Sequence, residues 1–152
     1  MVRLDPQNAQ LLLQIYDLRR EARLRRARDW VLGNFWADNL EQLNKLCPQG
    51  SDESAFFRQV ATYWDMVAAI VNRGMLDEDL FFETTTEALM VWLRTKNVAL
   101  EMRKVRKNPL FLRNLEILAE KQEKWYATRA PEALGELRKM IETMRKKAPG
   151  GG

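Results

Sequence analysis

The sequence predicts an all-α fold, a single compact domain of about five longer helices and two short ones. Residues that break helices are scarce, with 7 Gly and 5 Pro among 152 residues, and residues of high helix propensity are abundant. Apolar residues recur at steps of three and four, whereas no strand-like alternation lasts more than a few residues. A chain of this length folds as one domain without a disulfide or a metal ion to hold it together.

The first helix is expected at residues 8–28, or as far as Phe35. Asp5-Pro6 marks its start, because Asp is a good N-cap and Pro fits the first helical position. Its first half is apolar and its second half is rich in arginine. Gly33-Asn34 predicts a kink or a break near its end. A short helix is then expected at residues 39–46.

The clearest helical pattern lies at residues 54–73, which we expect to form the central helix. Ser51 or Asp52 supplies its N-cap, and Gly74 suits the left-handed residue that follows a helix end. One apolar stripe runs along this segment at helical spacing. Its members are Phe56, Val60, Tyr63, Trp64, Val67 and Val71.

One short and three longer helices are expected in the second half of the chain. Asp77-Glu78-Asp79 starts the short helix, since negative charge is favourable in a first helical turn. The longer helices are predicted at residues 87–106, 110–128 and 132–147. Asn108-Pro109 repeats the cap-plus-proline signal before the second of them.

These helices are expected to form one domain over residues 1–147, followed by a disordered tail at 148–152. The last helix should join the core through an apolar stripe at helical spacing. Its members are Leu134, Leu137, Ile141 and Met144.

Two absences restrict the chemistry that the chain can perform. It contains no histidine and one cysteine, Cys47. There is therefore no Ser–His or Cys–His pair, no imidazole metal ligand and no intramolecular disulfide. We expect no catalytic residue, no cofactor and no bound metal, and the sequence favours a protein that is not an enzyme. The Cys47 thiol is expected to be buried and inert.

Four carboxylates are the best candidates for metal binding or acid–base chemistry: Asp65, Asp77, Asp79 and Glu83. Carboxylate oxygens bind hard cations such as magnesium and calcium, and a carboxyl group in an apolar core can act as an acid. However, the acidic run lacks the glycine and the spacing of an EF-hand loop, and Asp65 is better interpreted as paired or solvated. A carboxylate-based metal protein or enzyme is therefore the second alternative.

The net charge of +4 is unevenly distributed, since acidic side chains outnumber basic ones in residues 51–90 and basic side chains outnumber acidic ones in residues 91–152. One basic cluster consists of Arg103, Lys104, Arg106 and Lys107. Such a cluster can bind nucleic acid, but basic residues late in a helix also complement its dipole without any ligand. No helix-turn-helix or zinc-finger pattern accompanies it. Nucleic-acid binding through basic helix faces is the first alternative function.

The favoured hypothesis is a non-enzymatic protein-interaction or self-association module that uses apolar helix surface left over from the core. The many Trp and Met residues agree with this interpretation, because both are enriched at interfaces, although they also fill cores. The chain shows no signal peptide and no apolar stretch of membrane-spanning length. We therefore expect a soluble, cytoplasmic protein whose partner is another protein or a second copy.

Three linked motifs occupy the segment Tyr63–Glu83. An aromatic pair and an acid precede Met in Tyr63–Met66, Val71–Asp77 reads VNRGMLD, and Leu80–Phe82 reads LFF. This combination resembles a bacterial family of small helical proteins described only as a domain of unknown function, and the likeness extends more loosely over residues 11–118. The resemblance implies a bacterial, helical protein without an established activity. It transfers no catalytic residue to this chain.

Overall fold

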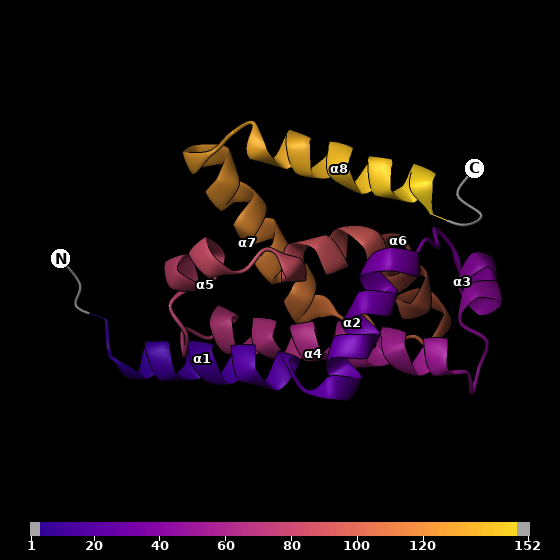
Figure 1. Ribbon diagram of the computed structural model, residues 1–152, viewed down its shortest axis with the longest axis horizontal. Helices are drawn as coiled ribbons and strands as arrows, with labels where there is room; N and C mark the ends of the chain where they lie inside the picture. Colours follow the sequence, from indigo (N-terminus) through magenta and orange to yellow (C-terminus); the bar gives the residue numbers. More distant parts are fainter. Residues whose placement is uncertain (1–3, 149–152) are drawn as a thin grey trace.

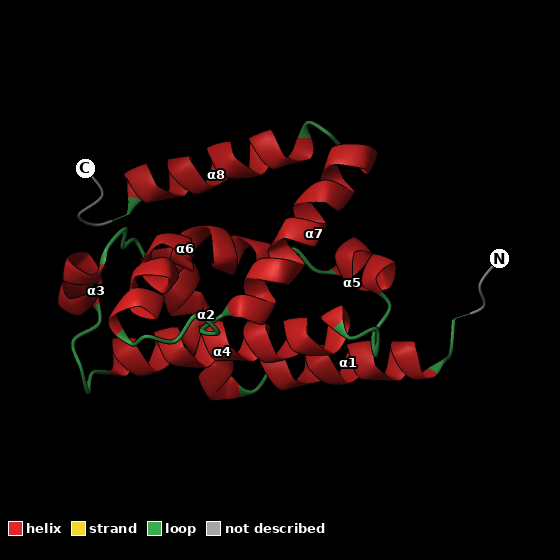
Figure 2. Ribbon diagram, turned by 180° about the vertical axis from the view of Figure 1, so that it is seen from behind, coloured by secondary structure: helices red, strands yellow, loops and turns green. Residues whose placement is uncertain are grey.

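The computed structural model describes residues 4–148 and confirms the all-α prediction (Figures 1 and 2). No strand occurs within these residues, and none of their helices is long and apolar enough to cross a membrane. The helices are α1 (Gln7–Arg19), α2 (Ala22–Asn34), α3 (Leu40–Leu46), α4 (Asp52–Asn72), α5 (Glu78–Thr84), α6 (Glu87–Val105), α7 (Arg113–Arg129) and α8 (Ala133–Lys147).

Helix α4 is the centre of the fold, as predicted. It packs most extensively against α2 and α7, and α6 packs against both α7 and α4. Helix α1 runs alongside α4 in Figure 1. The Tyr63 hydroxyl on α4 donates a hydrogen bond to the backbone oxygen of Ile15 on α1. Helix α8 runs along the top of the same view, beyond α7.

A row of aromatic rings crosses the core from α4 through α5 to α7. Trp64 and Phe81 are fully buried, and their ring centroids are 6.4 Å apart with an edge-on geometry. The row continues through Phe82 to Trp125, and the ring centroids of these two residues are 5.8 Å apart. Edge-to-face contacts of this kind add to the free energy gained from burial alone. The predicted apolar stripe of α4 is thus the middle of a larger aromatic cluster.

Both ends of α4 follow the local signals in the sequence. The Ser51 side chain accepts a hydrogen bond from the Ser54 amide at 3.1 Å, which caps the first turn. At the other end Gly74 has a φ of 77°, and the Met75 amide donates to the Ile70 oxygen at 3.2 Å. This is a Schellman ending, in which a left-handed residue allows the last carbonyls to find donors.

The first predicted helix is wrong in extent, because two helices, α1 and α2, replace it. The chain leaves the helical conformation at Glu21, where ψ is 138°. The Glu21 carboxylate accepts hydrogen bonds from the amides of Arg23 and Leu24, both at 3.0 Å, and so caps α2 from within the arginine-rich stretch. These bonds hold the pKa of Glu21 below its usual value. The expected break at Gly33-Asn34 coincides with the end of α2.

The predicted start of the helix at residues 110–128 is also wrong, because α7 begins three residues later. The Asn108 side chain accepts a hydrogen bond from the Leu110 amide at 3.0 Å and forms a local turn. Leu112 then has a φ of 53°, which interrupts any helix before Arg113. The cap-plus-proline signal therefore marks a turn here.

Helix α7 takes its cap from another helix. The Asp65 carboxylate on α4 accepts hydrogen bonds from the Leu115 amide at 2.9 Å and from the Asn114 side chain at 3.3 Å. The Asn72 side chain, two turns further along α4, donates to the Asn114 oxygen at 3.0 Å. One polar edge of α4 thus satisfies the start of α7, as an N-cap residue would.

The end of α2 is held by a buried arginine. The Arg94 guanidinium donates hydrogen bonds to the backbone oxygens of Leu32 and Phe35 and lies 3.7 Å from the Trp36 ring. It has no carboxylate partner among residues 4–148. Burial lowers the pKa of Arg94 to about 10. The cation therefore interacts with the carbonyl end of a helix dipole and an aromatic face.

Helix α8 joins the core less than predicted. None of its residues is buried, and Leu134 and Leu137 only pack against the edge of the core. Two ion pairs attach it to the rest of the protein: Arg138 pairs with Glu123 on α7, and Arg145, near the end of α8, pairs with Asp38. Apart from Ala148, which follows α8, the expected disordered tail at 148–152 lies outside the described residues. The domain boundary at residue 147 stays a prediction.

We predict that Asp65→Ala lowers the free energy of unfolding by about 1 kcal/mol, since the start of α7 loses its cap. Urea denaturation would measure this change. Asp17→Ala, which removes an exposed carboxylate from α1, is the control and should have little effect. Equal losses in the two variants would show that Asp65 does not cap α7.

Candidate functional site

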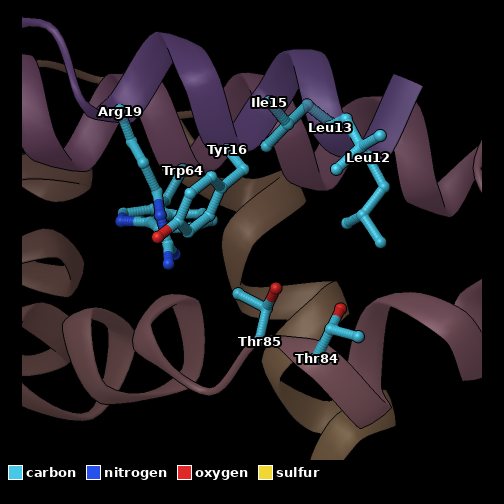
Figure 3. Close-up of a pocket in the computed structure, with 8 residues that line it drawn as sticks. All are labelled: Leu12, Leu13, Ile15, Tyr16, Arg19, Trp64, Thr84 and Thr85. Carbon is cyan, nitrogen blue, oxygen red and sulfur yellow. The ribbon is translucent and has the colours of Figure 1, made fainter. Parts of the chain in front are cut away.

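The candidate site is a groove between α1 and the connection from α5 to α6, with a volume of about 330 Å³ (Figure 3). Its apolar wall consists of Leu12, Leu13, Ile15, Tyr16 and Trp64. Arg19 lies at one end beside Tyr16 and Trp64, and Thr84 and Thr85 face α1 from the opposite side. We call this feature the α1 groove. A mainly apolar concavity with a few polar groups is typical of binding sites.

The groove is open because α1 buries little of its own surface. Ile15 is its only buried residue, whereas Leu13 is 66% and Tyr16 is 49% exposed. Few backbone contacts hold the helix, but the Asn8 side chain accepts a hydrogen bond from the Asp77 amide at 2.7 Å. Large apolar side chains on a concave exposed surface are characteristic of interaction sites.

Arg19 gives the groove a positive end. Its guanidinium lies 4.7 Å from the Tyr16 ring centroid and 5.9 Å from that of Trp64. Among residues 4–148 it has no ion-pair partner. The charge is therefore held by aromatic faces in the protein and is free to pair with an anion from outside.

A charged network lies directly behind the groove. The Glu87 carboxylate accepts two hydrogen bonds from Arg28, both at 2.7 Å, and one from the Trp64 indole at 2.9 Å. The side chains of Arg28 and Glu87 are only 17% and 13% exposed, and the hydrogen bonds that Arg28 donates to Glu87 raise the pKa of Arg28. Arg28 also donates to the Arg19 oxygen at 3.2 Å. The network thus ties α1, α2, α4 and α6 together.

Tyr63 supports the groove from α4. Its hydroxyl donates a hydrogen bond to the backbone oxygen of Ile15, which is the buried residue of α1 in the groove lining. Burial raises the pKa of Tyr63 to about 12, which the positive charges of Arg19 and Arg28 partly oppose. The phenol is therefore a neutral, structural donor at ordinary pH.

Of the four candidate carboxylates, three lie at or along α5 and Asp65 lies on α4. Asp65 caps α7, as described above. Asp77 caps α5 by accepting from the Leu80 amide at 2.9 Å, and Asp79 accepts from the Trp125 indole at 2.9 Å. Glu83 is exposed on α5. Within residues 4–148 no three acidic or thiol side chains gather in a way that would hold a metal ion.

The basic cluster at the end of α6 is divided by the fold. Arg103 forms a largely buried ion pair with Glu116 at 3.1 Å and donates to the Phe111 oxygen at 2.8 Å, so its charge is used internally. Lys104, Arg106 and Lys107 are exposed. Three of the four predicted nucleic-acid contacts are thus available at the surface, and the fourth is structural.

Sequence reasoning did not pair Arg28 with Glu87, because the two residues are 59 positions apart and belong to different helices. The helical spacing of each residue does indicate that it lies on a buried helix face. Arg28 lies three residues before the buried Val31, and Glu87 lies four residues before the buried Val91. A charged residue on the buried face of a helix needs an internal partner, but this spacing does not identify which residue the partner is.

Fold and site together define a small helical protein with an open apolar groove and, in the described residues, no group of three side chains that could hold a metal ion. The family model for a domain of unknown function, DUF4760, matches residues 6–125. The chain belongs to this family, which confirms the resemblance noted above; its implied bacterial origin stays a prediction. Neither the curated proteins nor the solved structures contain a match.

We predict that Glu87→Gln lowers the free energy of unfolding by roughly 2–4 kcal/mol. Removal of one partner leaves the Arg28 charge uncompensated, although its residual exposure screens part of the cost. Chemical denaturation is the measurement. Glu41→Gln is the matched control, because its pair with Lys45 has side chains 80% and 78% exposed and should contribute little. Similar losses at both positions would contradict the proposed role of Glu87.

Tyr63 should also make the protein sensitive to alkali. In the unfolded chain its phenol ionises near pH 10, whereas in the folded protein its pKa is about 12. The unfolded state therefore loses this proton first, and stability that is present below pH 10 is lost as the pH rises through 12. We predict that the decline is shallower in Tyr63→Phe than in Tyr16→Phe, as measured by urea denaturation across this range. Parallel declines would refute the assignment to Tyr63.

Proposed function

We propose that this protein is a non-enzymatic interaction module that binds a short amphipathic segment of a partner protein in the α1 groove. The observation that carries the proposal is the exposure of Leu13 and Tyr16 on the wall of a cavity that reaches the core at Trp64. Amphipathic helices and extended peptides bind to such grooves by inserting a few apolar side chains. The groove volume of about 330 Å³ is large enough for a few apolar side chains.

The charge of Arg19 favours a particular kind of segment. A carboxylate placed beside the inserted apolar side chain would pair with the guanidinium, and Thr84 and Thr85 line the facing wall. A partner with a basic residue in that place would be disfavoured by repulsion. We therefore propose a partner segment in which an Asp or Glu neighbours large apolar residues.

The proposal is tested by substituting exposed apolar residues inside and outside the groove. Leu13→Asp places a charge on the groove wall, and Leu110→Asp is the control, because Leu110 is 72% exposed and lies outside the groove. A partner captured by the wild-type protein should be reconstituted as a purified pair. We expect Leu13→Asp to weaken that complex by more than about tenfold, which corresponds to 1.4 kcal/mol, and Leu110→Asp to leave it unchanged.

A second comparison examines the predicted acidic partner. Arg19→Gln should weaken the same complex, whereas Arg25→Gln, at an exposed position on α2, should not. Equal binding by the wild-type protein and Leu13→Asp would overturn the proposal. Sedimentation that reveals a dimer abolished by Leu13→Asp would replace the partner segment with a second copy of the chain.

A further inference from the structure

A second concave surface, independent of the α1 groove, lies where α3, the start of α4 and the end of α6 meet. Its volume is about 600 Å³, within the range of small-molecule sites. We call it the α3 hollow. Its lining includes five side chains that can donate hydrogen bonds: Asn44, Gln49, Ser54, Arg58 and Arg106.

None of these five side chains donates a hydrogen bond to any protein group among residues 4–148. Arg58 and Arg106 have no ion-pair partner there either, although the Arg106 guanidinium lies 5.6 Å from the Phe111 ring centroid. Burial raises the pKa of Cys47 in the lining to about 11, and the negative charge of Glu53 adds to the rise. The lining itself contains two guanidinium groups and no carboxylate, so it is positive and rich in donors.

The floor of the hollow is apolar. Phe57 and Met102 contribute to its lining, and both are otherwise buried in the core. The Phe57 ring stacks on Phe35 with centroids 4.9 Å apart, so it is held in one orientation. An apolar floor with donors around it suits a ligand that combines a flat or apolar body with an anionic group.

The number of donors distinguishes between anions. A carboxylate offers two acceptor oxygens, whereas a phosphate monoester offers three and a charge near −2. Two guanidinium forks match phosphate geometry better than isolated ammonium groups do. The amides of Asn44 and Gln49 both donate and accept, which matches the polar edge of a nucleobase.

We propose that the α3 hollow binds a nucleoside monophosphate group. Arg58 and Arg106 hold the phosphate, the amides of Asn44 and Gln49 contact the base edge, and the base rests on the apolar floor beside Phe57. This chemistry occurs in a free mononucleotide and at the 5′-phosphorylated end of a nucleic acid strand. It uses only Arg106 from the basic cluster at the end of α6.

Calorimetric titration of the full chain with the four common ribonucleoside monophosphates tests the proposal. At least one should bind, and the corresponding nucleoside and inorganic phosphate should each bind at least about tenfold more weakly, because each lacks half of the contacts. Arg58→Gln and Arg106→Gln should each weaken binding by about tenfold. Arg25→Gln is the control and should bind like the wild-type protein, and the exposed positions of all three residues keep the fold intact.

Short oligonucleotides with and without a 5′-phosphate identify the source of the ligand. Binding of the phosphorylated strand but of no free mononucleotide assigns the hollow to a strand end, and binding of the mononucleotide alone assigns it to a metabolite. Equal binding of both strands would reduce the interaction to general charge attraction and overturn the proposal. Absence of binding by every mononucleotide and by the phosphorylated strand would overturn it as well, as would equal affinities of Arg58→Gln and Arg25→Gln.

Discussion

The hydrogen bonds of the Glu87 carboxylate are the interaction on which the packing of the helices around α1 depends. Its oxygens accept from Arg28 on α2 and from Trp64 on α4, while the residue itself begins α6. Arg28 continues the network to the last carbonyl of α1. Because a mostly buried carboxylate must remain compensated, the positions of these four helices are coupled more tightly than apolar packing alone requires. The open groove therefore has a rigid back wall even though α1 itself is lightly attached.

Helix α4 connects the two concave surfaces. Trp64 lies in the wall of the α1 groove, and Phe57, seven residues earlier, lies in the α3 hollow, a separation of about 10 Å along the helix axis. Both side chains are fixed by aromatic neighbours, and both ends of the helix are capped. One capped helix thus supplies residues to both concave surfaces.

Local features of this fold were predictable, and long-range ones were not. The N-cap of α4 at Ser51 and its C-terminal turn at Gly74 each depend on groups a few residues apart, so both could be predicted from the local sequence. The Glu87–Arg28 bond joins residues 59 positions apart, and no local pattern names the partner. The start of α2 at Glu21 was not predicted for a related reason, since an acidic residue among arginines is as consistent with surface ion pairing as with a helix start. Neither concave surface was foreseen, because each arises where three or more segments meet.

Because α8 is weakly attached, we expect it to open at a lower free-energy cost than the helices that form the core. Its residues line the edge of the core without being buried in it, and the family match ends before it begins. Opening α8 would break a few surface ion pairs and expose little apolar area, so its backbone amides should exchange with solvent through a local fluctuation that leaves the other helices closed. The last helix is then an appendage to the core, and we expect its exposed connection to α7 to tolerate cleavage or fusion.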